Sequence, residues 1–175
     1  MGVDTVTLFL AMLAALAAAL TLVIAVSALT GDRFGVIAAV RPVALELATA
    51  VAVTATAGSL YLSEGAGYEP CRLCWVQRGF MYPAAILLVL AVLRRWRWAM
   101  LAAGALAAIG LPVAIFHRVE QAAGGIGSLC ELDNPCSSRW VEHFGFVTIP
   151  TMAAVGFATI MALVSLVAFT PQNVS

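Results

Sequence analysis

The chain contains no lysine, and charged side chains occupy only 10% of its 175 positions. Its nine basic residues, all of them arginines, balance nine acidic residues, so the formal net charge is zero. Proteins that bind nucleic acid carry basic patches or stripes with interleaved aromatic side chains. The sequence contains no such stripe, and we therefore predict no nucleic-acid partner.

Long polar stretches are also scarce, because 63% of the residues are hydrophobic. Soluble globular domains are closer to half apolar, and roughly a quarter of their residues are charged. The composition instead indicates an all-α protein surrounded by a lipid bilayer. A chain of 175 residues is expected to form one domain of this kind.

Apolar runs long enough to cross a bilayer as helices recur along the chain. Pro83 and Pro112 each lie within a run and predict a kink there, because proline removes a backbone donor. Residues 36–40 are expected to lie along the membrane interface. The five runs span about residues 5–30, 42–62, 75–93, 99–116 and 145–169.

The first run is too long for the apolar core of a signal peptide, and no basic residue precedes it. We therefore predict a transmembrane helix rather than a cleaved signal. Ala11, Ala15 and Ala19 form a stripe of small residues on this helix. Such a stripe either packs closely against another helix or faces lipid, and the sequence leaves both possibilities open.

A very short basic turn, from Arg94 to Trp98, separates the third and fourth runs. Under the positive-inside rule this turn faces the cytoplasm. The N-terminus then lies outside and the C-terminus inside. Two loops, at residues 63–74 and 117–144, fall on the external face and contain all the cysteines. Disulfides persist in that compartment, whereas the cytosol is reducing.

Cys71 and Cys74 form a C-x-x-C pair at the start of the third run. Such a pair closes a small reversible disulfide or binds a metal. The positive end of the helix dipole favours a thiolate at Cys74. Arg78 lies one helical turn deeper on the same face, where its cation also stabilises an anion.

The other two cysteines, Cys130 and Cys136, lie in the second external loop. The four thiols suit a zinc site, two inert structural disulfides or a redox relay. In a relay, one pair exchanges electrons with a soluble protein and the other with a carrier dissolved in the membrane. The longer spacing of the second pair disfavours zinc, but the residues alone do not decide among the three.

Two segments of the chain resemble the DsbB family of disulfide-bond formation proteins, in its BdbC-like branch with a shorter loop. The first is Cys71-x-x-Cys74-Trp-x-Gln-Arg78-x-x-Met-Tyr-Pro83. The second runs from Cys130 to Ser137 and continues with Phe-Gly-Phe-Val-Thr-Ile-Pro at residues 144–150. The resemblance covers about residues 43–169 and implies a four-helix transmembrane bundle. Members re-oxidise a DsbA-like thiol oxidase of the thioredoxin fold and pass the electrons to a membrane quinone.

The resemblance implies a role for each cysteine. Cys71 and Cys74 correspond to the pair coupled to the quinone, which is ubiquinone or menaquinone. Cys130 and Cys136 correspond to the shuttle pair that meets the soluble oxidase. The expected setting is the bilayer of a bacterial cytoplasmic (inner) membrane with its quinone pool. The cysteine loops would lie on the external or periplasmic side.

Three residues are expected to contact the quinone: Cys74, Arg78, which resembles the arginine that holds the head group, and His117 after the fourth run. From the residues alone, His117 and Gln121 are neighbours one turn apart at a helix end. A histidine that caps helix carbonyls is therefore an alternative for His117. We expect no metal-binding residue.

The first run departs from the family pattern. We divide the chain into an extra N-terminal transmembrane helix at residues 1–35 and a DsbB-like four-helix bundle at residues 36–175. The extra helix either packs on the bundle or anchors it in lipid. Two other functions stay open: a quinone-linked enzyme like the vitamin K epoxide reductases, and a non-enzymatic membrane protein with structural disulfides. The early C-x-x-C favours the DsbB-like function over the reductase.

Overall fold

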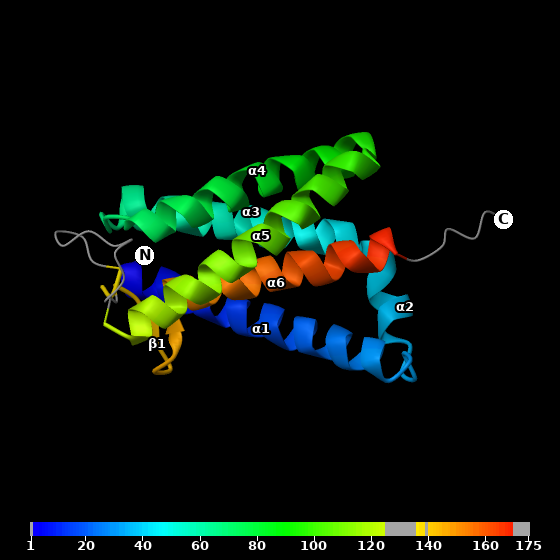
Figure 1. Ribbon diagram of the computed structural model, residues 1–175, viewed down its shortest axis with the longest axis horizontal. Helices are drawn as coiled ribbons and strands as arrows, with labels where there is room; N and C mark the ends of the chain where they lie inside the picture. Colours follow the sequence, from blue (N-terminus) through cyan, green and yellow to red (C-terminus); the bar gives the residue numbers. More distant parts are fainter. Residues whose placement is uncertain (1, 125–135, 139, 170–175) are drawn as a thin grey trace.

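Five long helices dominate the fold (Figure 1), and each is long and apolar enough to cross a membrane. The computed structural model describes residues 2–124, 136–138 and 140–169. The prediction of a helical membrane protein with five spans is confirmed. The long helices are α1 (Val3–Leu29), α3 (Ala44–Leu60), α4 (Arg72–Arg94), α5 (Arg97–Ala122) and α6 (Ile149–Ala168).

Short elements connect the helices. The α2 helix (Val36–Val40) and a 3-10 turn (Arg41–Val43) link α1 to α3. A π-helical turn (Tyr61–Gly65) ends α3. An antiparallel hairpin of β1 (Glu142–His143) and β2 (Val147–Thr148) precedes α6. In Figure 1, α2 lies across the end of the molecule at a steep angle to α1.

The helices α3 to α6 form the central bundle. Helix α5 packs between α4 and α6, and α3 contacts both α4 and α6. Leu88, Phe157, Ile160 and Leu163 are fully buried in its core. At Gly110 of α5, an added Cβ atom would lie 2.5 Å from ring atoms of Phe157. The absence of a side chain at Gly110 therefore lets α5 and the Phe157 ring approach each other closely.

Helix α1 packs on this bundle along α6. Within the apolar span, the Thr21 and Thr159 hydroxyls lie 2.8 Å apart and share a hydrogen bond. Near the start of α1, His143 Nε2 lies 3.0 Å from the Thr7 hydroxyl oxygen. Hydrogen bonds between helices are a common link inside a bilayer, where water cannot compete. The extra helix is therefore part of the bundle.

The face that α1 presents to the bundle differs from the alanine stripe. Its buried residues are Thr7, Ala11, Ile24 and Ser27, whereas Ala15 and Ala19 are exposed. Of the two possibilities left open for the stripe, close packing holds at Ala11, and exposure holds at Ala15 and Ala19. Thr7 and Thr21 face the bundle, where their hydrogen-bond partners lie in the hairpin and in α6.

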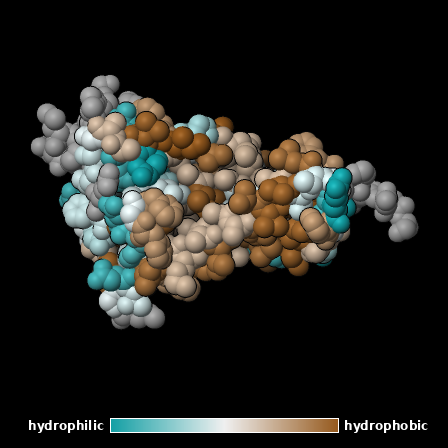
Figure 2. Space-filling model, turned by 90° about the horizontal axis from the view of Figure 1, so that it is seen from below, coloured by the Kyte–Doolittle hydropathy of each residue, from teal (hydrophilic) through white to brown (hydrophobic). Residues whose placement is uncertain are grey.

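Two polar ends flank an apolar belt (Figure 2), as expected for a bundle that crosses a bilayer. The N-terminus and the hairpin lie at one end, and α2 and the C-terminal end of α6 lie at the other (Figure 1). The basic turn is present as predicted. Arg95 there has a left-handed backbone with φ of 52°, and the Trp96 and Trp98 rings stack 5.6 Å apart.

The main error in the sequence prediction concerns the second loop, which was expected from residue 117. Helix α5 continues to Ala122, because its last turns still have a packed face with His117 and Gln121 buried. The short hairpin before α6 was also not predicted. Helices α4 and α5 both continue through Pro83 and Pro112, and the kinks expected at these prolines stay predictions.

Candidate active site

The C-x-x-C pair lies where the loop after α3 enters α4. Cys71 has an extended backbone and is the N-cap of α4, and Cys74 lies in the first turn. Both are free thiols, and their Sγ atoms lie 3.2 Å apart, within hydrogen-bonding distance. The two sulfurs are thus already adjacent, and closure of a disulfide requires little movement.

His117 of α5 lies directly against this pair. Its ring is buried, and its Nε2 lies 3.6 Å from Cys71 Sγ. On the other side, Gln77 Nε2 lies 2.7 Å from His117 Nδ1. If the Gln77 amide donates to Nδ1, the neutral ring carries its proton on Nε2. The ring then donates that proton to Cys71, so Gln77 orients a hydrogen-bond donor toward the sulfur.

These contacts lower the pKa of the Cys71 thiol, which lies just before the α4 span. The hydrogen bond with Cys74 is the largest cause, and the hydrogen bond with His117 adds to it, while burial opposes both. The sequence analysis placed the thiolate at Cys74. In the reduced pair the structure favours it at Cys71, because that sulfur accepts hydrogen bonds from Cys74 and from His117.

The same three residues form a possible metal site. The ligand atoms of Cys71, Cys74 and His117 all lie within 4.8 Å of one another, close enough to share one ion. This set differs from the four-cysteine zinc site considered from the sequence. The expected absence of a metal ligand stays a prediction.

Cys136 lies next to the C-x-x-C pair, although it is distant in sequence. It is buried, with 1% of its surface exposed, and clusters with Cys71, Leu73 and Cys74. Unlike Cys71 and Cys74, it is engaged in a disulfide. Gln121 of α5 donates a hydrogen bond to the Ser138 carbonyl at 3.3 Å, which ties the Cys136 segment to α5. The predicted shuttle residue Cys130 lies outside the described residues.

Arg78 projects from α4 toward the end of α3. Its Nε donates to the Ser59 hydroxyl at 2.9 Å, and its Nη2 donates to the Ser59 carbonyl at 2.8 Å. The Tyr82 hydroxyl donates to the Ser59 hydroxyl oxygen at 3.3 Å. The guanidinium also lies 5.1 Å from the centre of the Trp75 ring, a cation–π distance. These contacts hold Arg78 in place and leave further N–H donors for a ligand.

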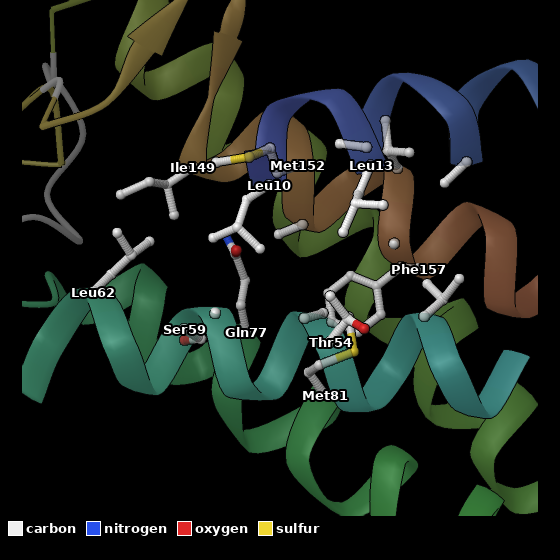
Figure 3. Close-up of a pocket in the computed structure, with 18 of the residues that line it drawn as sticks. Leu10, Leu13, Thr54, Ser59, Leu62, Gln77, Met81, Ile149, Met152 and Phe157 are labelled. Atoms are coloured by element: carbon white, nitrogen blue, oxygen red, sulfur yellow. The ribbon is translucent and has the colours of Figure 1, made fainter. Parts of the chain in front are cut away.

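A cavity of about 430 Å³ begins at this arginine and extends between α1, α3, α4 and α6. Its volume lies within the roughly 300–1,000 Å³ range of small-molecule sites. In Figure 3, Gln77 and Met81 reach it from α4, Leu10 and Leu13 from α1, and Met152 from α6. Its polar lining is concentrated near the cysteines, and the rest is largely apolar. The polar residues there are Ser59, Tyr68, Glu69, Cys74, Gln77, Arg78 and Tyr82.

The predicted quinone-contacting residues divide between two spaces. Cys74 and Arg78 line the large cavity. His117 lines instead a small pocket with Cys71, Cys74 and Cys136. The alternative from the sequence was that His117 caps helix carbonyls. In the described structure its ring hydrogen-bonds the side chains of Gln77 and Cys71 instead.

Sequence reasoning missed the partners that orient the site. Ser59 accepts hydrogen bonds from Arg78 and Tyr82, which lie on a different helix. The sequence analysis assigned no direct role to Gln77. Gln77 is 40 residues from its partner His117, so no local periodicity links them. The signal available in the sequence was the spacing, because a polar glutamine follows Cys74 by one helical turn.

The model of the family described as "Disulfide bond formation protein DsbB" matches residues 40–168. The chain belongs to the DsbB family. The matched segment contains Cys71, Cys74, Arg78, His117 and Cys136. It begins after the end of α1. No solved structure matches the chain.

Similar proteins are known by name in several bacteria. The chain is 42% identical to "Probable disulfide formation protein C 1" of Bacillus anthracis over 121 residues, covering 67% of this chain and 86% of that protein. It is 36% identical to "Disulfide bond formation protein C" of Bacillus subtilis over 128 residues, covering 72% and 93%. It is 38% identical to "Probable disulfide formation protein" of Deinococcus radiodurans over 137 residues, covering 71% and 88%. DsbB-family membership and these relatives identify a multi-pass membrane oxidoreductase of disulfide formation.

Proposed function

We propose that the protein re-oxidises a DsbA-like thiol oxidase of the thioredoxin fold and transfers the electrons to a membrane quinone. Its setting would be a bacterial cytoplasmic membrane, with the cysteine end on the external side. The observation that carries this proposal is the position of Cys74. It touches Cys71 and the Cys136 segment on one side and lines an apolar cavity on the other.

The contact between Cys136 and Cys71 supports exchange between the two cysteine pairs. In the proposed sequence, the reduced oxidase attacks the Cys130–Cys136 disulfide and forms a mixed disulfide at Cys130. The released Cys136 thiolate then attacks Cys71 of the oxidised C-x-x-C pair, which breaks the Cys71–Cys74 bond and frees Cys74. Cys136 is already packed against Cys71, so this exchange needs little rearrangement.

The chain's own residues fit a quinone in the large cavity. A bound quinone supplies a two-electron acceptor that dissolves in lipid. Arg78 offers N–H donors for a carbonyl oxygen, and the Ser59 contacts fix the direction of its guanidinium. The apolar remainder of the cavity excludes water from the Cys74 side. His117 is expected to act on Cys71, where its hydrogen bond stabilises the thiolate of the reduced pair.

The test is quinone-dependent oxidation of the C-x-x-C pair. The purified, reduced protein is mixed anaerobically with ubiquinone or menaquinone analogues, and free thiols at each cysteine are counted by alkylation and peptide mass spectrometry. We expect Cys71 and Cys74 to lose their free thiols only when quinone is present. Thiols that stay free with every quinone would contradict the proposal and favour a structural role for the cysteines.

Arg78→Gln gives a sharper form of this test. Loss of a hydrogen bond from a charged donor costs about 1.5–3 kcal/mol, or roughly ten- to a hundredfold in apparent quinone affinity. Arg72→Gln is the matched control, because Arg72 is exposed at the start of the same helix. Equal Michaelis constants for quinone in the Arg78 variant and the control would exclude this role for Arg78.

A further inference from the structure

The cavity beside Cys74 has a wall that the family match does not include. The match begins at residue 40, whereas α1 ends at Leu29. Six α1 residues nevertheless line the cavity: Leu10, Leu13, Ala14, Leu16, Ala17 and Leu20. They cover about three turns along one side of the helix. Helix α1 therefore lines the cavity along its length and does not touch it at one point only.

The position of α1 on the bundle explains why a cavity remains between α1 and α3. The helix packs along α6 and is fixed at two depths, to α6 by Thr21 with Thr159 and to the hairpin by Thr7 with His143. It approaches α3 closely near Gly58, where an added Cβ would lie 3.0 Å from a methyl carbon of Leu10. Along α3 the two helices are otherwise separated by the cavity, whose α3 lining includes Leu47, Val51 and Thr54.

The lining changes character along the cavity. At the cysteine end it includes Cys74, Gln77 and Arg78, beneath the Tyr68 and Trp140 rings, which stack 5.2 Å apart. Beyond that end, the α1 residues contribute only hydrocarbon. One continuous space therefore offers hydrogen-bond donors at one end and a mostly apolar lining along the rest, with Thr54 as a polar exception. Such a space suits a ligand with a polar ring and a branched hydrocarbon tail.

We propose that α1 forms the tail-binding wall of the quinone site, with Leu10 and Leu13 in contact with the first isoprenoid units. This inference rests on the proposed use of a quinone. Helix α1 then serves in ligand binding rather than in anchoring, and the affinity for the quinone tail depends on the side chains of this helix. The ring contacts remain those of Arg78 and its neighbours in α4 and α3.

Photo-crosslinking tests the contact directly in the intact wild-type protein. The probe is a benzoquinone that carries a diazirine on its first isoprenoid unit, added to quinone-depleted protein in lipid nanodiscs. After irradiation, peptide mass spectrometry locates the adducts. We expect adducts between Leu10 and Leu20 of α1, in competition with unlabelled isoprenoid quinone. Competed adducts restricted to α3, α4 and α6 would overturn the proposal.

A pair of α1 variants separates tail binding from ring binding. Leu13→Trp fills the cavity, whereas Leu22→Trp alters a residue that is 65% exposed on the same helix and does not line it. Equilibrium binding is measured for one benzoquinone with an isoprenoid tail and another with only methyl groups. Two displaced methylene groups are worth about tenfold in affinity.

We therefore expect Leu13→Trp to weaken binding of the tailed quinone about tenfold or more and to leave the methyl quinone nearly unchanged. Leu22→Trp should change neither. If wild-type protein binds both quinones and Leu13→Trp affects neither, α1 is not the tail wall, while quinone use stands. If wild-type protein binds neither quinone, the proposed function and this inference both fail. Crosslinking on the wild-type chain decides the question even if Leu13→Trp does not fold.

Discussion

At the scale of single residues, the two sulfurs of the C-x-x-C pair have different surroundings. Cys71 faces His117, which in turn is oriented by Gln77. Cys74 faces the cavity shared with Arg78. Under the proposed function, the sulfur attacked during exchange and the sulfur next to the quinone would therefore be distinguished by their neighbours.

The pKa of Cys71 gives a test at this scale. Because hydrogen bonds from Cys74 and His117 stabilise the thiolate and lower this pKa, removing either donor should raise it. The reduced wild-type protein should then alkylate at Cys71 at about pH 6, below the usual range of thiol pKa values. His117→Ala should shift the pH profile of alkylation upward, and Cys74→Ala should shift it further.

The control for this measurement is His143→Ala. His143 is the only other histidine of the sequence, and it hydrogen-bonds Thr7 rather than any cysteine in the described part of the chain. Its Cys71 profile should match that of the wild-type protein. A His117→Ala profile that also matches the wild type would show that the histidine does not stabilise the thiolate.

At the scale of helices, the close packing of α5 against α6 depends on glycine at the contact. Gly110→Ala would place a Cβ atom 2.5 Å from the buried Phe157 ring. Overpacking of this kind costs roughly 1–3 kcal/mol, so we expect a lower melting temperature. Gly79→Ala, with no atom within 4 Å of the added Cβ, should be neutral or should stabilise by up to about 1 kcal/mol from helix propensity.

Thermal unfolding of the two variants in the same detergent measures the difference. If Gly110→Ala unfolds at or above the temperature of Gly79→Ala, the packing of α5 against Phe157 is looser than described.

The positions of the helices were largely predictable, whereas their ends and mutual contacts were not. An uninterrupted apolar run must form a helix in lipid, because every backbone group needs an internal partner. The end of α5 was misplaced, since its last turns contain polar residues whose burial depends on α4 and on the Cys136 segment. The position of α1 was undecidable for the same reason: Thr7 and Thr21 find their partners more than 130 residues away.

The candidate site shows the same division. Local spacing predicted the C-x-x-C pair and the arginine one turn below it, and family resemblance added Cys136 and His117. Ser59 could not be found in this way, because it is 19 residues from Arg78 and lies on another helix. Side chains that bind the reacting groups leave sequence motifs, whereas side chains that hold them in place depend on the fold.

At the scale of the whole molecule, the fold fixes which segments share an end. The N-terminus lies at the end with the hairpin, opposite α2 and the end of α6 (Figure 1). Which end faces the cytoplasm remains the prediction made from the Arg94–Trp98 turn. In a variant without native cysteines, an impermeant maleimide added to intact cells should label Ala123→Cys and spare Phe34→Cys.

Phe34→Cys should react only after the cells are permeabilised, which controls for its accessibility, since Phe34 is 86% exposed. The opposite labelling pattern would mean that the cysteine end faces the cytoplasm, where a reducing environment would work against disulfide formation.

The position of Cys74 between two spaces has a final consequence under the proposed function. Among the described cysteines, it alone lines the large cavity, while Cys71 and Cys136 line only the small pocket at the polar end. The water-soluble oxidase would exchange with the Cys130–Cys136 disulfide, whereas a hydrophobic oxidant would reach Cys74 from the large cavity, so the two would never compete for the same surface. The protein would sort its two redox partners by solubility, and electrons would pass from one to the other by exchange between two disulfides.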